Sequence, residues 1–459
     1  MKVPRIGRLA IPERLRGLAI PARIRQRWRA GLRAQRRWWR ERRRGRDEAG
    51  LLFPAAGKGM VAVQTLIDEG VDAPPAVHPG PRIAVLHASA GTGHQAAARA
   101  LAAAILARAP GAIVREVDTL VFASRLYRDT YAASYNAMAA RAPALWGVLY
   151  HSWAEARVNR STAPMRLAMD RLNLRRLVRV VDREAADAVV CTHFLPVEAL
   201  VPPRRGHIRA PLYCVITDFT AHPFWAFRQV DRYFVASPQV ARELSGHGVP
   251  REHIEVTGIP VHPRFTHTIG RAAARAHLGI EGDGPLVLVM GGGHGVGPLT
   301  ELAGRLAALP MKPQVAVLCG MNARLRSRVA ALPAAHAGRV RALGFSTEVD
   351  VWLEACDLVV SKAGGLTCSE ALIKRAPLII FKPTPGQEVR NAEFLEAAGA
   401  ARHADSVDEV AATAREWLSH PEVRARLQEA ASRIAAPHAA ETIARRVLED
   451  VAQRDGRRG

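Results

Sequence analysis

Cysteine, aromatic side chains and long apolar runs are all scarce in this sequence of 459 residues. The five cysteines are odd in number, widely spaced and without a C-x-x-C pair, so we expect buried thiols in a reducing compartment, not disulfides or a zinc site. No apolar run approaches the roughly 20 residues that a membrane-spanning helix needs. The N-terminus also lacks the uninterrupted apolar stretch of a signal peptide. These absences predict a cytoplasmic protein that does not span a membrane.

The chain is long enough, and apolar enough, for two hydrophobic cores. Hydrophobic residues make up 49% of the composition, which excludes wholesale disorder. A single core rarely grows to 459 residues, so two large domains are expected. The phosphate-binding pattern G-x-x-x-x-G-K-[ST] is absent, which excludes a nucleotide hydrolase of the P-loop class.

Positive charge is concentrated at the N-terminus. Residues 1–50 hold 17 Lys or Arg against 4 Asp or Glu, and so carry 13 of the 23 excess positive charges. Ile24, Trp28, Leu32 and Trp39 recur at nearly one helical face among these arginines. A basic helix with tryptophans on one side favours binding to an anionic membrane surface. A solvated tail, or a tail that binds RNA electrostatically, remains open.

Alternating short apolar runs and helical segments follow the Pro/Gly-rich break at 73–81. This alternation predicts parallel sheets covered by helices on both faces, and it occurs twice along the chain. We therefore expect an α/β protein with two Rossmann-like, doubly wound domains that face each other across a cleft. The expected divisions are a basic amphipathic extension at 1–75, an N-terminal domain at 76–262, a C-terminal domain at 263–436, and a helix and tail at 437–459.

Three glycine-rich turns each join an expected strand to an expected helix, at 91–93, 291–297 and 361–372. Backbone amides at such turns lie at the positive end of the helix dipole and suit a phosphate. The first turn also matches G-x-G-x-x-A, a variant of the dinucleotide fingerprint, with Glu116 and Asp118 near the end of the next strand. On this evidence alone, a nicotinamide-dependent enzyme remains an alternative.

The C-terminal half adds further polar groups at successive strand ends. Gly344-Phe345 predicts a turn against which a base packs, and the carboxylate of Glu370 can accept hydrogen bonds from ribose hydroxyls. Gln387, Glu388 and Asn391 supply carboxamides and a carboxylate beyond the phosphate turns. This combination indicates a site for a nucleotide diphosphate, with polar groups left over for a sugar.

Six motifs together resemble the family of monogalactosyldiacylglycerol synthases and processive diacylglycerol glucosyltransferases. They are SAGTGHQAAARAL, VITDFTAHPFW, TGIPVHPRF, GGGHGVG, SKAGGLTCSEAL and PTPGQEVRN, in this order from about residue 82 to 400. The resemblance implies a GT-B fold, a UDP-sugar donor in the C-terminal domain and a lipid acceptor at the N-terminal domain. It also implies an inverting transfer of galactose or glucose to diacylglycerol.

Donor contacts are expected from the turns and polar groups just described. They are Gly291, Gly292, Gly293, Gly295, Phe345, Ser361, Gly364, Gly365, Leu366, Thr367, Glu370, Gln387, Glu388 and Asn391.

An inverting transfer needs a base for the acceptor hydroxyl and a way to stabilise the leaving diphosphate. His94 is the expected base, with Asp218 as partner or alternative and His222 as a further catalytic residue. The sequence has no Asp-x-Asp pair, so loop amides with Lys362 or Arg390 are expected to stabilise the diphosphate, and no metal or other cofactor is required.

The expected partners are a UDP-hexose, diacylglycerol or a related lipid, and an anionic membrane surface contacted through residues 1–50, with no specific nucleic acid. The aromatic segment 126–153 is either helix core or a bilayer-facing acceptor region. These expectations place the protein on the inner face of the cell membrane as a peripheral protein. A different lipid-linked or small-molecule acceptor, or a non-catalytic nucleotide- or RNA-binding role, stays open.

Overall fold

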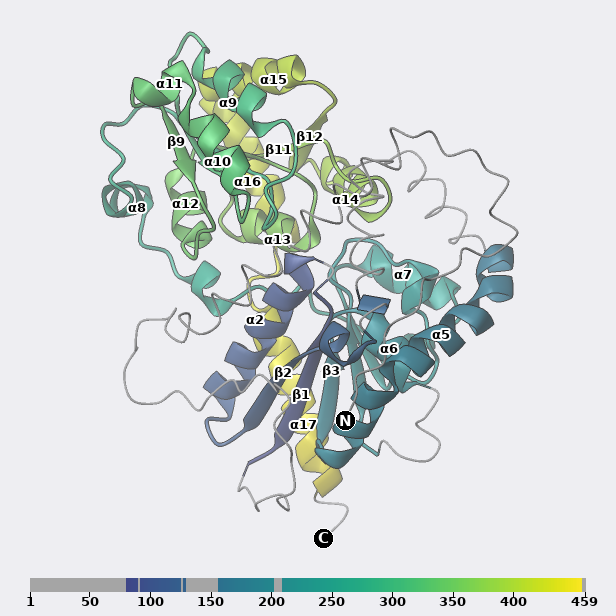
Figure 1. The fold of residues 1–459 in the computed structure, drawn as a ribbon. Coiled ribbons are helices and arrows are strands. Elements are labelled where there is room, and N and C mark those ends of the chain that lie inside the picture. The colour runs from purple at the N-terminus through teal and green to yellow at the C-terminus, as the bar shows by residue number, and fades with distance from the viewer. Residues whose placement is uncertain (1–79, 90, 125–126, 129–155, 202–208, 456–459) are drawn as a thin grey trace, which may run out of the picture. The chain divides into compact units, whose positions relative to one another are not determined.

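A computed structural model describes residues 80–89, 91–124, 127–128, 156–201 and 209–455. The basic extension at 1–75 and almost all of the aromatic segment 126–153 lie outside these residues. The described residues form two six-stranded parallel sheets (Figure 1). Both sheets belong to one compact unit within residues 61–459. The expectation of two doubly wound α/β domains is confirmed.

The first sheet has the strand order β2-β1-β3-β4-β5-β6. Its apolar strands are buried because helices cover both faces, which is the usual setting of a parallel sheet. The strands are β1 (Arg82–His87), β2 (Ile113–Asp118), β3 (Ala188–Cys191), β4 (Leu212–Val215), β5 (Arg232–Val235) and β6 (Ile254–Val256). The sheet changes direction of winding at β1, which pairs Leu86 with Val117 on one side and with Cys191 on the other.

Helix α2 (Thr92–Arg108) begins directly after Gly91 and covers one face of this sheet. The first residue of the helix is Thr92, and its buried face begins with Ala97 and Ala98. His94 therefore lies inside the first turn. The C-terminal helix α17 (Ala439–Asp455) packs on the same face with Ile443 and Val447, beside α2 (Figure 1). The opposite face is covered by α5 (Ala156–Arg183), α6 (Phe194–Leu200) and α7 (Pro238–Gly246).

The second sheet has the order β12-β11-β10-β7-β8-β9. Its strands are β7 (Leu286–Met290), β8 (Gln314–Leu318), β9 (Val340–Leu343), β10 (Leu358–Ser361), β11 (Leu378–Phe381) and β12 (Ala401–Ala404). Its helices are α8 (Arg271–His277), α9 (Leu299–Ala307), α10 (Ala323–Ala330), α11 (Pro333–His336), α12 (Val349–Ala355), α13 (Gly365–Ile373), α14 (Gln387–Ala397), α15 (Val407–Ser419) and α16 (Pro421–Ile434). Winding reverses between β7 and β10, and ligands in such sheets bind at the carboxyl ends of the strands beside this reversal.

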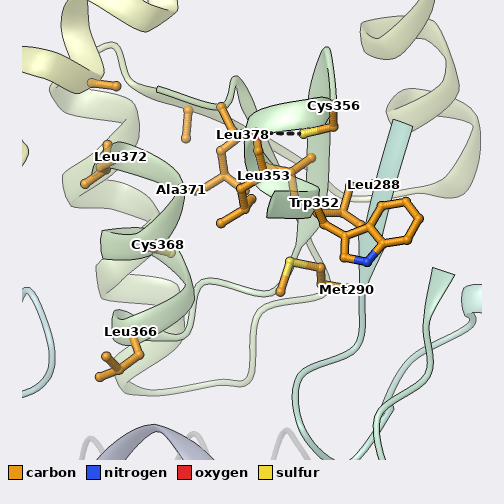
Figure 2. Close-up of a cluster of buried hydrophobic side chains, with 14 of the residues drawn as sticks. Leu288, Met290, Trp352, Leu353, Cys356, Leu366, Cys368, Ala371, Leu372 and Leu378 are labelled. Atoms are coloured by element: carbon orange, nitrogen blue, oxygen red, sulfur yellow. Dashed lines mark hydrogen bonds between the residues drawn. The ribbon is translucent and has the colours of Figure 1, made fainter. Parts of the chain in front are cut away.

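A buried apolar cluster seats α13 on the second sheet. Cys368 and Ala371 of α13 belong to one buried cluster with Leu288 and Leu378 of the strands and with Trp352 of α12 (Figure 2). All five cysteines are buried and free, as the sequence predicts. Within the described ranges, no helix combines the length and the apolar character needed to cross a membrane.

Candidate active site

His94 occupies the first turn of α2, at the carboxyl end of β1. Its Nδ1 lies 2.9 Å from the carbonyl oxygen of Thr192 and 2.9 Å from Oγ1 of Thr217. A carbonyl oxygen can only accept, so Nδ1 carries the hydrogen and Nε2 keeps its lone pair. Burial is the main cause that lowers the pKa of His94, to about 4. The imidazole is therefore neutral at pH 7, which is the form a base requires.

Aromatic rings surround His94 on the first sheet's side of the site. The ring of His193 packs edge-on at a centroid distance of 4.5 Å, and the indole of Trp225 lies at 6.5 Å. His193 is held in turn because its Nδ1 accepts from the amide of Leu195, and Phe194 stacks on its ring. Sequence reasoning missed His193. The available signal was its place directly after β3, the strand beside β1 in the sheet.

Glu116 is fully engaged by neighbours within the first sheet. Its carboxylate lies 3.2 Å from Nε2 of His87 and accepts hydrogen bonds from Gln95 and Arg99. Asp118 accepts from two backbone amides. The carboxylate that a dinucleotide fingerprint would offer to a ribose is thus occupied, which removes the main support for a nicotinamide site.

Asp218 and His222 both follow β4 but have different hydrogen-bond partners. Asp218 accepts a hydrogen bond of 2.9 Å from the amide nitrogen of Asn391. Burial raises the pKa of Asp218 to about 6, and the negative charge of Glu388 adds to this. His222 is buried, and its Nδ1 accepts from the amide of Phe224 as the cap of a short 3₁₀ helix, Pro223–Trp225. That helix carries Trp225 to the vicinity of His94.

The glycine-rich turn after β7 requires glycine for steric reasons. Gly292 and Gly295 have φ angles of 66° and 57°, in the left-handed region. A Cβ atom on Gly295 would overlap the carbonyl oxygen of Cys319. A Cβ atom on Gly293 would overlap the side chain of Thr92, so this turn lies against the start of α2. Gly291 is equally enclosed by Gly295 and Leu299.

The N-terminus of α13 also meets the first sheet. Gly364 caps the helix, and a Cβ atom on Gly365 would overlap the carbonyl oxygen of Thr217. Leu366 is buried and approaches Gly93. The first turn of α13, which includes the half-buried Thr367, therefore lies near the start of α2, which carries His94.

Two predicted donor residues of the second sheet's domain, Ser361 at the end of β10 and Glu370 in α13, differ in their surroundings. Burial raises the pKa of the Glu370 carboxyl to about 8, and the charge of Arg264 partly offsets that effect. Ser361 is buried, and its hydroxyl donates to the carbonyl of Met290, so its contact is internal to the sheet. Glu370 is one helical turn beyond Leu366 and half-buried.

A lysine faces this region from the turn before α13. Lys362 Nζ lies 3.0 Å from Glu388, whose carboxylate also accepts from the amide of Thr384 at 2.6 Å. Glu388 is thereby fixed at the first turn of α14, next to the half-buried Gln387. Burial lowers the pKa of His294 in the glycine turn, and the positive charge of Lys362 contributes to that shift.

Phe345 is 62% exposed at the carboxyl end of β9. Met321 and Val296, which follow β8 and β7, are 56% and 46% exposed. These three exposed apolar side chains follow the neighbouring strands β9, β8 and β7. The sequence analysis named Phe345 but not Met321 or Val296, and the packing of a base on Phe345 stays a prediction.

Asn391 is the predicted donor residue whose surroundings differ most from the expectation. It is fully buried, and all of its side-chain bonds go to protein groups: the amide of Phe219, the carboxylate of Asp218 and the carbonyl of Ala363. A direct sugar contact by Asn391 stays a prediction. Among the other predicted residues, His94 and Gly365 contact Thr217, and Gly293 lies against Thr92 at the start of α2.

Two parallel, doubly wound sheets with a polar site at their strand ends define a GT-B protein. A solved S. aureus MnaA–UDP co-structure shares this fold, with a TM-score of 0.54 at 14% sequence identity over 79% of this chain and 94% of that chain. Residues 94–261 match the family described as monogalactosyldiacylglycerol (MGDG) synthase. Residues 286–444 match the glycosyltransferase family 28 C-terminal domain.

Two relatives from Bacillus species narrow the family to which the chain belongs. A processive diacylglycerol beta-glucosyltransferase of Bacillus thuringiensis is 32% identical over 279 residues, which cover 60% of this chain and 71% of that protein. The enzyme of the same name from Bacillus pumilus is 32% identical over 240 residues, covering 51% of this chain and 62% of that protein. The chain thus spans less than two thirds of the length of some of these relatives. It belongs to the family of MGDG synthases and processive diacylglycerol glucosyltransferases.

Proposed function

We propose that this protein is an inverting glycosyltransferase that moves a hexose from a UDP-sugar to diacylglycerol. One observation carries the proposal: the start of α2, with His94, lies against the glycine turn at Gly293, while Thr217 beside His94 lies against Gly365. A neutral base is thereby placed next to two turns suited to a diphosphate. Family membership and the names of the relatives supply the substrate classes.

In this proposal the C-terminal sheet holds the donor. Phe345 packs against the uracil, and Glu370 accepts from the ribose hydroxyls. Amides of the turn at 291–295 and of the N-terminus of α13 surround the diphosphate, with Lys362 as a nearby cation. Gln387 and Glu388 at the first turn of α14 are placed to contact the hexose.

The chemistry is a direct displacement. Nε2 of His94 takes the proton of the acceptor hydroxyl while the acceptor oxygen forms a bond to the anomeric carbon. The bond from that carbon to the diphosphate oxygen breaks, and its electron pair leaves on UDP. Preorganised amides and the α13 dipole stabilise the developing negative charge without reorganisation. Attack opposite the leaving group inverts the anomeric configuration.

A membrane-surface location forms the second part of the proposal. On α5, Met165, Met169 and Leu172 are 68%, 53% and 66% exposed and recur at i, i+4 and i+7. Leu174 and Leu177 on the opposite face of the helix are buried. Exposed arginines continue the outward face, namely Arg176, Arg179 and Arg183. Apolar residues followed by arginines suit an anionic bilayer.

The helix is also linked to the candidate site. The guanidinium of Arg166 lies 4.0 Å from the ring centroid of Phe224 and pairs with the buried Glu198. Phe224 contacts Phe194, which in turn stacks on His193 beside His94. This chain of rings is a suitable wall for an acyl chain that enters from the surface of α5.

Transfer of radiolabelled hexose from UDP-glucose or UDP-galactose to diacylglycerol in mixed micelles tests the proposal. A labelled product that migrates as a monohexosyl or longer glycolipid, with β configuration from the α-linked donor, is expected. Transfer to no lipid acceptor with either donor would refute it.

A further inference from the structure

Helix α14 contacts the segment 218–222 directly through two side chains, and a third side chain reaches that segment through Glu243. The helix begins after Gly386, which has a φ angle of 101°, and its first turn carries Gln387 and Glu388. Arg390, Asn391 and Phe394 follow within the next two turns. Each of these three side chains contacts a residue on the first sheet's side of the site that is distant in the sequence.

Asn391 provides the central contact. Its Oδ1 accepts from the amide of Phe219 at 2.8 Å, and its Nδ2 donates to Asp218 at 2.9 Å and to the carbonyl of Ala363 at 2.9 Å. These partners fix the orientation of the carboxamide, because an amide N–H needs the oxygen and the carboxylate needs the nitrogen. Asn391 thus joins three segments: the loop after β4, the turn before α13, and α14 itself.

Two further contacts flank Asn391. The ring of Phe394 stacks on Phe219 at a centroid distance of 5.0 Å with planes 13° apart. Arg390 donates to one oxygen of Glu243 at 2.7 Å. The other oxygen of Glu243 accepts from the amide of Ala221 at 2.7 Å. Residues 218, 219 and 221 are therefore all held, directly or through one side chain, by α14.

We infer that α14 couples donor binding to the position of the acceptor-side loop 218–222, and that Asn391 is a positioning residue. The inference rests on the proposed function, since it takes Lys362 as a cation near the donor diphosphate, and Lys362 Nζ lies 3.0 Å from Glu388 in the first turn of α14. A helix moves as a rigid element, and Asn391 lies only one turn beyond Glu388. Any displacement of the first turn by a bound sugar diphosphate is transmitted to Asp218 and Phe219.

The contacts of Asn391 favour an all-or-none coupling between α14 and the loop 218–222. Asn391 is 0% exposed, so a partial separation would leave a buried carboxamide and the carboxylate of Asp218 without partners. Asp218 is next to Thr217, which contacts His94. The loop position set by α14 is thus also the position of a contact to the candidate base.

Hydrogen exchange and kinetics of the full chain test this inference with UDP as the probe. In the wild type, UDP is expected to increase protection of the amides of Phe219 and Ala221. Asn391→Ala is expected to bind UDP within about twofold of the wild type, to lose that protection, and to lower kcat by about 10- to 100-fold, the range for a misplaced group. Arg390→Ala and Glu243→Ala should reduce the protection of Ala221, with effects that are not additive in the double variant.

Arg402→Ala is the matched control, since Arg402 pairs with the exposed Glu416 within the second sheet's domain. It should leave both protection and kcat unchanged. The inference is overturned if UDP leaves Phe219 and Ala221 unprotected in the wild type, or if Asn391→Ala keeps wild-type protection and kcat. It is also overturned if Asn391→Ala weakens UDP-sugar binding in proportion to kcat, since Asn391 would then act as a donor contact.

The same data separate this inference from the proposed function. UDP-dependent protection does not require diacylglycerol as the acceptor. Protection in the wild type and its loss in Asn391→Ala, together with no transfer to diacylglycerol, would refute the proposed acceptor and leave the coupling intact. Transfer to diacylglycerol without UDP-dependent protection would refute the coupling and support the proposed acceptor.

Discussion

Gly365 packs directly against the carbonyl oxygen of Thr217, with no room for a Cβ atom between them. The hydroxyl of the same threonine lies 2.9 Å from Nδ1 of His94. One residue therefore joins the N-terminus of α13 to the candidate base. The contact therefore sets the spacing between the N-terminus of α13, the proposed diphosphate site, and the candidate base.

Gly365→Ala is expected to reduce transfer by about 100-fold or more, because the added methyl group displaces α13 from Thr217 and misplaces the reacting groups. The measurement is kcat/KM for the UDP-sugar. Gly304→Ala is the control: this glycine lies inside α9 with space for a Cβ, and alanine there should stabilise the fold by about 0.5–1 kcal/mol. Equal activity of the two variants would show that the contact is dispensable.

His94→Ala is expected to lower kcat by about 10²- to 10⁴-fold, the usual contribution of a general base. Binding of UDP, measured by calorimetry, should stay unchanged because the proposed diphosphate contacts come from the other sheet. His420→Ala, at an exposed histidine paired with Glu422, serves as the control and should retain activity. Wild-type turnover in His94→Ala would remove this residue from the mechanism.

Glu370 makes the stability of the protein depend on pH. Its pKa is raised from 4.5 to about 8, mainly by burial, so between these values the folded chain holds a proton that the unfolded chain releases. This contribution to stability is fully present below pH 4.5 and is lost as pH rises toward 8. Glu370→Gln keeps the shape without the titration.

Urea unfolding of wild type and Glu370→Gln at several pH values measures this effect. The free energy of unfolding of the variant should rise relative to the wild type as pH increases from 5 to 8, within the window set by the raised pKa. Glu429→Gln, at an exposed carboxylate paired with Arg433, is the matched control for a surface glutamate. A constant difference between Glu370→Gln and wild type would contradict the assignment.

Two surfaces are predicted to act in membrane binding. Deletion of residues 1–50 should weaken sedimentation with phosphatidylglycerol vesicles far more than binding of a soluble UDP-sugar, because it removes 13 net positive charges. Combined replacement of Met165, Met169 and Leu172 by serine should weaken it independently, since exposed apolar area is lost.

The control for the triple variant replaces Ile269 and Val256 by serine. These side chains are 53% and 46% exposed and lie outside α5. Phosphatidylcholine vesicles should bind all forms weakly, because the electrostatic contribution requires anionic lipid. Wild-type vesicle binding by both the truncated and the triple variant would refute the membrane assignment.

The sequence by itself determined the local features of this protein. Apolar runs that end in glycine predict strands and sharp turns, since both depend mainly on neighbouring residues, and β7 with Gly291–Gly295 is one such case. The apolar pattern of such runs also led to the expectation of buried cysteines and parallel sheets, and the structure confirms both. His94 and Phe345 were named from the sequence because they come shortly after such strands, and their roles stay predictions.

Only the tertiary structure decided which of these side chains already have hydrogen-bond or ion-pair partners within the protein. Asn391 is separated from Asp218 by 173 positions, and His94 from Thr192 by 98, so no local pattern reveals either contact. Glu116 is occupied by His87, and α17 returns to the first sheet, through packing that periodicity does not encode. Hydrogen-bond partners and burial depend on the proximity of distant segments, and that proximity exists only once both cores have formed.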